Sequence, residues 1–177
     1  MAAVGDFSRF DSPDKLVAYV GLNPKVRQSG NSAPVHGRIS KTGRAHVRGI
    51  LVEAAWSASH APGPLRAFYQ RIKARRGFQT AVVATARKMT VLAWHLATKD
   101  QDYAFARPGL VAHKRRKLEL TAGAPSRRGN HRQPGAAYND KQRRNAEAAA
   151  AERAEHAYQV LVAHWQPRKP ARQSTRA

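Results

Sequence analysis

Residues 19–48 read YVGLNPKVRQSGNSAPVHGRISKTGRAHVR, and the other elements of the chain are arranged around this stretch. It holds four glycines, two prolines, three serines and six Lys or Arg residues, and it contains no carboxylate. Gly, Pro, Ser and Asn suit turns and positive φ angles, so this composition predicts a loop. A loop that concentrates cations and hydroxyls between helices is where we expect a phosphate-binding site.

Helical patterns flank the loop on both sides. Residues 12–14, Ser-Pro-Asp, supply an N-cap, a proline at the first helical position and an acid in the first turn. Gly21 then ends a short helix over residues 13–20. We expect Trp56 and Trp94 to be core residues and not a ligand platform, as is usual for aromatic residues at helical spacing. Apolar residues at that spacing predict three longer helices, over residues 43–59, 65–76 and 79–98.

Three basic residues, Arg44, His46 and Arg48, crowd the start of the helix predicted over residues 43–59. Cations at a helix N-terminus oppose the helix dipole. This arrangement predicts that an external anion compensates them, although solvated surface arginines would cost little.

The strongest compositional signal is the charge. The chain has 177 residues with 32 Lys or Arg against 11 Asp or Glu, a formal net charge of +21. Residues 1–103 carry a net charge of +10 and residues 104–177 carry +11, so the excess is not confined to a tail. Such a charge indicates a nucleic-acid partner and not a membrane. No apolar run approaches a membrane span, the first residues lack a signal-peptide pattern, and the absence of cysteine favours a cytoplasmic, nucleoid-associated protein.

The fold prediction is a mainly α protein. Residues 7–103 form a small helical domain with a helix-hairpin-helix-like start, in which a glycine turn would meet phosphate through backbone N–H groups, and with a basic Gly/Ser loop. A basic arm follows. Its predicted parts are a disordered linker over residues 104–138, a possible helix over residues 139–166 that is solvated or docks on a partner, and a basic tail over residues 167–177.

Ser29 is the candidate nucleophile of the loop. The loop has neither a Walker pattern nor a dinucleotide fingerprint, and the chain shows no zinc pattern. A serine hydroxyl needs activation, and nearby Arg or Lys side chains would stabilise the charge that develops on a phosphodiester under attack. From chemistry alone, a turn serine that bonds its own backbone is the simpler interpretation.

Three ordered segments carry a family resemblance: SPDKLVAYVGLNP (residues 12–24), QSG (28–30) and GRISKTGRAHVR (37–48). Together with residues 67–76 and 81–96, they resemble the C-terminal domain of the bridge-RNA-guided insertion-sequence transposases, also described as DEDD transposases. The resemblance covers about residues 7–105.

The resemblance implies that Ser29 attacks DNA and forms a phosphoserine link. It also implies an oligomer, a structured guide RNA, and a RuvC-like domain whose four carboxylates bind Mg²⁺. The six acids of residues 1–103 do not supply such a spaced quartet. We therefore expect no cofactor in this chain, and Mg²⁺ only on a RuvC-like domain, which would act in trans.

The functional hypothesis is a transposase or recombinase fragment that takes part in DNA transposition and is inactive alone. Two alternatives stay open: a non-catalytic nucleic-acid-binding protein that keeps only the basic surface, and a basic RNA-binding protein of ribosomal type. The candidate site has Ser29 as the catalytic residue, no metal ligand, and as DNA-binding residues Arg27, Gln28, Gly30, Arg38, Lys41, Arg44, His46 and Arg48.

Overall fold

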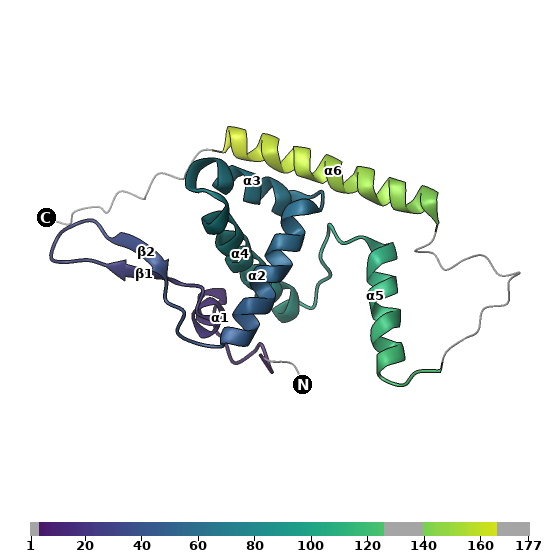
Figure 1. The fold of residues 1–177 in the computed structure, drawn as a ribbon, viewed down its shortest axis with the longest axis horizontal. Coiled ribbons are helices and arrows are strands. Elements are labelled where there is room, and N and C mark those ends of the chain that lie inside the picture. Colours follow the sequence, from purple (N-terminus) through teal and green to yellow (C-terminus); the bar gives the residue numbers. More distant parts are fainter. Residues whose placement is uncertain (1–3, 126–139, 166–177) are drawn as a thin grey trace, which may run out of the picture.

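The computed structural model describes residues 4–125 and 140–165 (Figure 1). The predictions for residues 126–138 and for the tail from residue 166 onward lie outside this described part. The mainly α fold is confirmed. The described elements are α1 Pro13–Val20, β1 Pro24–Arg27, β2 Val35–Ile39, α2 Ala45–His60, α3 Pro64–Arg76, α4 Phe78–Thr98, α5 Pro108–Thr121 and α6 Lys141–His164.

The core is a bundle in which α4 packs against α1, α2 and α3. Ten buried residues form one cluster, which follows from the helical spacing of apolar positions in these segments. A hydrogen bond of 2.9 Å from Trp94 Nε1 to the Phe10 carbonyl ties the N-terminal segment to α4. The buried cluster consists of Phe10, Leu16, Val17, Val20, Leu22, Ala55, Tyr69, Ala81, Val82 and Ala86.

The predicted short helix is confirmed at both ends, since α1 spans Pro13–Val20 and Gly21 follows it in the left-handed region with φ 78°. The prediction that Trp56 is a core residue is wrong, because its side chain is 47% exposed. Its neighbour Ala55 is fully buried, and consecutive helical residues are rotated by about 100° around the axis. Because the Ala55 side chain faces the core, the next residue, Trp56, points toward solvent.

The stretch predicted as one loop contains a two-stranded antiparallel sheet. Val26 pairs with His36 and Arg27 pairs with Val35, with an irregularity nearer Pro24. β-branched residues favour strands, whereas Gly, Ser, Asn and Pro gather in the turn over residues 28–34. Because turn-forming residues dominate the whole stretch, its composition did not predict these two short strands.

The glycine turn after α1 bonds to its own helix. The Gly21 N–H donates to the Val17 and Ala18 carbonyls at 3.1 and 2.9 Å, as in a helix C-cap. This N–H is therefore engaged inside the chain and does not face outward, as it would in a phosphate-binding glycine turn. The hairpin also separates α1 from α2.

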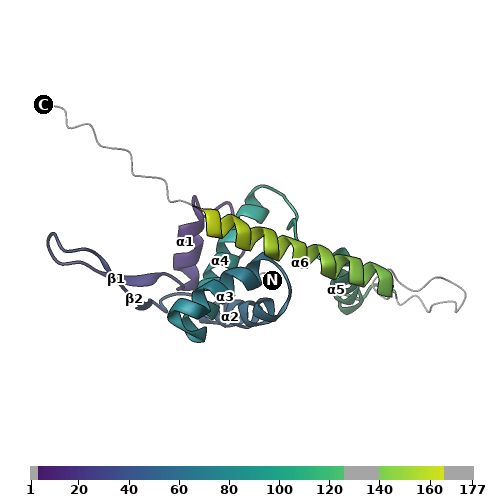
Figure 2. The same cartoon turned by 90° about the horizontal axis from the view of Figure 1, so that it is seen from above.

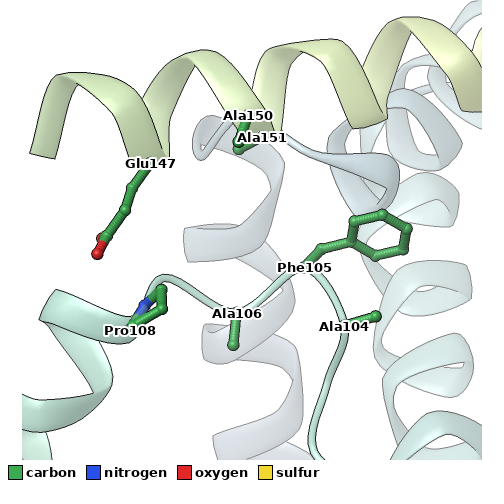
Figure 3. Close-up of a pocket in the computed structure, with 7 residues that line it drawn as sticks. All are labelled: Ala104, Phe105, Ala106, Pro108, Glu147, Ala150 and Ala151. Atoms are coloured by element: carbon green, nitrogen blue, oxygen red, sulfur yellow. The ribbon is translucent and has the colours of Figure 1, made fainter. Parts of the chain in front are cut away.

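Residues 108–121 form α5 in place of the predicted linker. Lys, Arg, Leu and Glu all have good helix propensity, so a basic run is compatible with a helix. The Glu147 carboxylate of α6 accepts a 2.9 Å hydrogen bond from the Gly109 N–H in the first turn of α5. Figure 3 shows Glu147 directed toward the Pro108 end of α5, beside a small hollow that Phe105 and Ala151 also line. A carboxylate at this place also favours the α5 dipole.

α6 lies across α3 (Figure 1). Asp140 caps it by accepting hydrogen bonds from the Gln142 and Arg143 N–H groups at 2.9 and 3.3 Å. The Glu155 carboxylate is buried, and it accepts from the Gly63 N–H at 3.1 Å and from the Arg66 guanidinium at 2.6–2.9 Å. The helix predicted over residues 139–166 therefore docks on its own chain.

Replacing Glu155 should loosen α6. Burial alone would raise the pKa of Glu155, but the bonds from Arg66 and Gly63 and the Arg66 charge hold it below its ordinary value of 4.5. The ionised Glu155 carboxylate therefore stabilises the docked position of α6. This stabilisation is complete above pH 4.5 and is lost as the pH falls through the lowered pKa of Glu155. Glu155→Gln should cost about 1–3 kcal/mol of docking free energy, because charged donors lose their partner. Hydrogen exchange of the α6 amides, with exposed Glu152→Gln as control, measures this cost. Equal α6 exchange rates in the two variants would contradict it.

No helix in the described residues combines the length and the apolar character that crossing a membrane requires.

Candidate nucleic-acid interface

The β1–β2 hairpin projects from the helical bundle, as two perpendicular views show (Figures 1 and 2). Every residue from Lys25 to Arg38 is exposed, including Val26 at 53% and Val35 at 66%. An isolated two-stranded hairpin is only marginally stable in water. A projecting basic hairpin with apolar side chains on its surface is typical of an element that a partner covers.

The register places two cations, Lys25 and Arg27, on one face of the hairpin. Paired residues share a face, so Arg27 lies with Val35 and Val26 lies with His36. Lys25 shares the face of Arg27, because side chains alternate along a strand. The irregularity between Pro24 and Val26 lies opposite Gly37 and Arg38, so regular alternation does not extend from His36 to Arg38.

Ser29 lies in the exposed turn between the strands, flanked by the predicted site residues Gln28 and Gly30. Its backbone carbonyl accepts a 3.3 Å bond from the Ser32 N–H. Its hydroxyl forms no hydrogen bond within the described residues. The carbonyl, and not the side chain, thus makes the turn contact, and the hydroxyl is accessible from outside.

Two of the predicted DNA-binding cations form hydrogen bonds with residues of α1. The Arg48 guanidinium donates to the Val20 carbonyl at 3.0 Å, and Arg44 Nε donates to the Tyr19 hydroxyl at 2.8 Å. Both partners lie at the C-terminal end of α1, where the helix dipole favours a cation. Arg44 and Arg48 thus each have a partner within the chain, and an external anion at the start of α2 stays a prediction. Sequence reasoning missed Tyr19, since no local pattern links it to a residue 25 positions later.

The remaining predicted ligands, Lys41 and His46, are exposed near the base of the hairpin. Lys41 has a positive φ of 58°. Its backbone N–H donates to the Gly21 carbonyl at 3.2 Å. The strained backbone at Lys41 therefore helps to bring the chain back against the C-terminal end of α1.

The base of the hairpin is joined to α1 through its backbone. The Ser40 N–H donates to the Asn23 carbonyl at 2.7 Å, and the Arg44 N–H donates to the Tyr19 carbonyl at 3.0 Å. Gly43 has φ 129°, and a Cβ there would overlap the Tyr19 carbonyl oxygen. Only glycine allows this close approach, which fixes where the hairpin leaves the bundle.

Replacing Gly43 by alanine should destabilise the protein by about 1–3 kcal/mol, because the positive φ and the Tyr19 carbonyl both reject a Cβ. Thermal unfolding followed by circular dichroism measures this change. Gly49 in α2 is the matched control: a Cβ there has nothing within 4 Å. Gly49→Ala should be stabilising by up to about 1 kcal/mol. A Gly43→Ala protein as stable as the parent would contradict this account of the hairpin base.

The described part of the chain brings together no group of three or more His, Asp or Glu side chains that could hold a metal ion.

The described chain begins with the short helix α1, followed by a basic hairpin that carries an exposed serine. The helix α2 comes next, and the junction between α1 and α2 contains Gly21 and Gly43. Residues 1–70 match the model of the transposase IS116/IS110/IS902 family. This range contains α1, the hairpin and α2. The resemblance to insertion-sequence transposases is thereby confirmed for these residues, whereas guidance by RNA stays a prediction.

Two curated relatives extend the match. The chain is 34% identical over 96 residues to a Sinorhizobium fredii protein named as transposase y4qE, covering 54% of this chain and 22% of that protein. It is 31% identical over 106 residues to the transposase for insertion sequence element IS1111A of Coxiella burnetii, covering 58% and 29%. The chain thus spans about a quarter of the length of these relatives. No solved structure matches it significantly.

Proposed function

We propose that this protein takes part in DNA transposition, and that the hairpin brings Ser29 to a DNA phosphodiester. One observation carries the proposal: an exposed serine stands at the tip of a projecting cationic hairpin, within the residues that match the transposase family model. In this proposal the protein acts at the nucleoid.

Duplex DNA fits the hairpin by shape and by charge. The major groove admits a two-stranded β-ribbon, and phosphates line both of its edges. The exposed side chains of Arg27 and Arg38, one on each strand, would reach phosphates at the edges of the groove. Val26 and Val35 lie on opposite faces of the hairpin, so one of them would meet the groove floor, where thymine methyl groups lie.

The proposed chemical step is a phosphoryl transfer. The Ser29 Oγ attacks phosphorus, an Oγ–P bond forms, and the P–O bond to the leaving deoxyribose oxygen breaks. The proton of the hydroxyl passes to a base, and the leaving oxygen takes up a proton. Cations of the hairpin stabilise the charge on the five-coordinate phosphorus. The product is a phosphoserine ester.

In the proposal the base and the carboxylates come from a partner. The Ser29 hydroxyl forms no hydrogen bond with a base within the described residues, and these residues bring together no group of three or more potential metal ligands. We therefore assign the base and the carboxylates to a RuvC-like domain in trans, where Mg²⁺ would stabilise phosphoryl charge. A homo-oligomer and a structured guide RNA are further partners in this proposal.

The test is a covalent adduct. The full chain is incubated with nicked or branched element-end DNA, with and without the RuvC-like domain of a relative, and the mixture is denatured and separated by electrophoresis. We expect DNA-linked protein only when the RuvC-like domain is present, with the DNA mapped to the peptide that contains Ser29 by mass spectrometry.

A non-catalytic DNA-binding protein is the second candidate. The observation in its favour is that the Ser29 hydroxyl forms no hydrogen bond with a base within the described residues. If no adduct forms even with the RuvC-like domain while duplex DNA still binds, the binding role alone is supported.

A further inference from the structure

Three aromatic rings form an exposed row on α2 and α4, outside the hairpin itself. The ring centroids of Trp56 and His60 are 5.0 Å apart, and those of Trp56 and Phe78 are 6.4 Å apart. Trp56 is 47% exposed, Phe78 is 53% exposed, and His60 is also exposed. We call Trp56, His60 and Phe78 the aromatic row. Large exposed rings that touch one another are uncommon on the surface of a single domain and indicate a binding surface.

The C-terminal end of α3 supplies cations next to this row. Lys73, Arg75 and Arg76 lie in the last turn of α3, and Gly77 alone separates Arg76 from Phe78. All three are exposed, and none forms an ion pair with another described residue. Residues 54–99 contain no carboxylate. The surface therefore combines exposed rings with uncompensated positive charge.

We propose that the aromatic row and the α3 cations bind a strand of nucleic acid with unpaired bases. Bases stack on aromatic rings, while Arg and Lys contact the phosphates between them. A duplex keeps its bases stacked inside and offers the rings nothing to stack on. Glu53, the one carboxylate of α2, lies one turn before Trp56, so the phosphates would run on the side of Arg75 and Arg76.

The position of this surface suits a strand that has left a duplex at the hairpin. The turn between α3 and α4 lies on the same side of the bundle as the hairpin in both views (Figures 1 and 2). The α3 cations and Phe78 also lie beyond residues 1–70, the range of the family match. Strand binding here does not depend on Ser29 chemistry, so its test is separate from the adduct assay.

The test measures the anisotropy of a labelled fifteen-nucleotide oligo(dT), the matching oligo(rU), and a DNA duplex, each with the full chain. Phe78→Ala and Trp56→Leu should each weaken single-strand binding about 5- to 150-fold, the usual effect of removing one stacking ring. Duplex affinity should change less than about twofold. The double variant Arg75→Gln/Arg76→Gln should reduce the slope of log affinity against log salt by about 1.4 for single strands. The oligonucleotide that binds more tightly, oligo(dT) or oligo(rU), shows whether the bound strand is DNA or RNA.

Phe105→Ala is the matched control, because Phe105 is 48% exposed but lies on the segment before α5 (Figure 3). It should leave single-strand affinity unchanged. Phe78→Trp keeps a stacking surface and should retain binding, which separates stacking from any loss of folding. Single-strand affinity within twofold of the parent for both Phe78→Ala and Trp56→Leu would overturn the proposal, as would an equal loss for Phe105→Ala.

Discussion

Replacing Ser29 by alanine should abolish the covalent adduct between protein and DNA and leave duplex affinity within about twofold of the parent. The adduct requires the Oγ atom as nucleophile, and no other atom of that side chain can replace it. The hydroxyl has no hydrogen bond within the described residues, and the turn is held by the Ser29 carbonyl. Alanine therefore removes the nucleophile without disturbing the hairpin.

Ser32→Ala is the matched control for this result, since Ser32 lies in the same exposed turn and engages the Ser29 carbonyl through its backbone N–H. It should keep full adduct formation. Adduct from the Ser29→Ala protein, mapped to Ser32 or to another hydroxyl, would show that the nucleophile has been assigned to the wrong residue. Loss of both adduct and DNA binding would mean that the substitution acts on the hairpin and not on chemistry.

Local patterns predicted the helices well because their signals are local. Pro13 and Gly21 bound α1, and Gly77 ends α3, as the sequence indicates. The hairpin was missed because four- and five-residue strands leave too short an alternation to stand out from a turn-rich stretch. The docking of α6 rests on Glu155 reaching Arg66 and Gly63, residues about 90 positions away. No sequence window contains both partners.

The same contrast between local and long-range signals applies to the candidate site. The cations and Ser29 could be found from their density in one stretch. Which cations are available to a ligand could not, because that depends on the C-terminal end of α1. Trp56 shows the same limit: helical spacing placed it in the core, but the burial of Ala55 turns it outward.

The second large effect concerns the exposed cations of the hairpin and the affinity for duplex DNA. The double variant Arg27→Gln/Arg38→Gln should weaken duplex binding roughly sixtyfold at 0.1 M salt, because each phosphate contact that releases a counterion contributes nearly tenfold there. The slope of log affinity against log salt should fall by about 1.8. Both side chains are exposed on the hairpin strands, so stability should stay unchanged. Anisotropy titrations of a labelled duplex at several salt concentrations measure both quantities.

Arg48→Gln supplies the contrast, since it removes one positive charge from the same stretch of sequence. Its guanidinium bonds the Val20 carbonyl at the end of α1, so the loss should appear as about 0.5–1.5 kcal/mol of folding stability. The salt slope for duplex binding should stay that of the parent. If Arg48→Gln lowers the slope by about one unit while the hairpin variant leaves it unchanged, DNA lies against the α1–α2 junction and not along the hairpin.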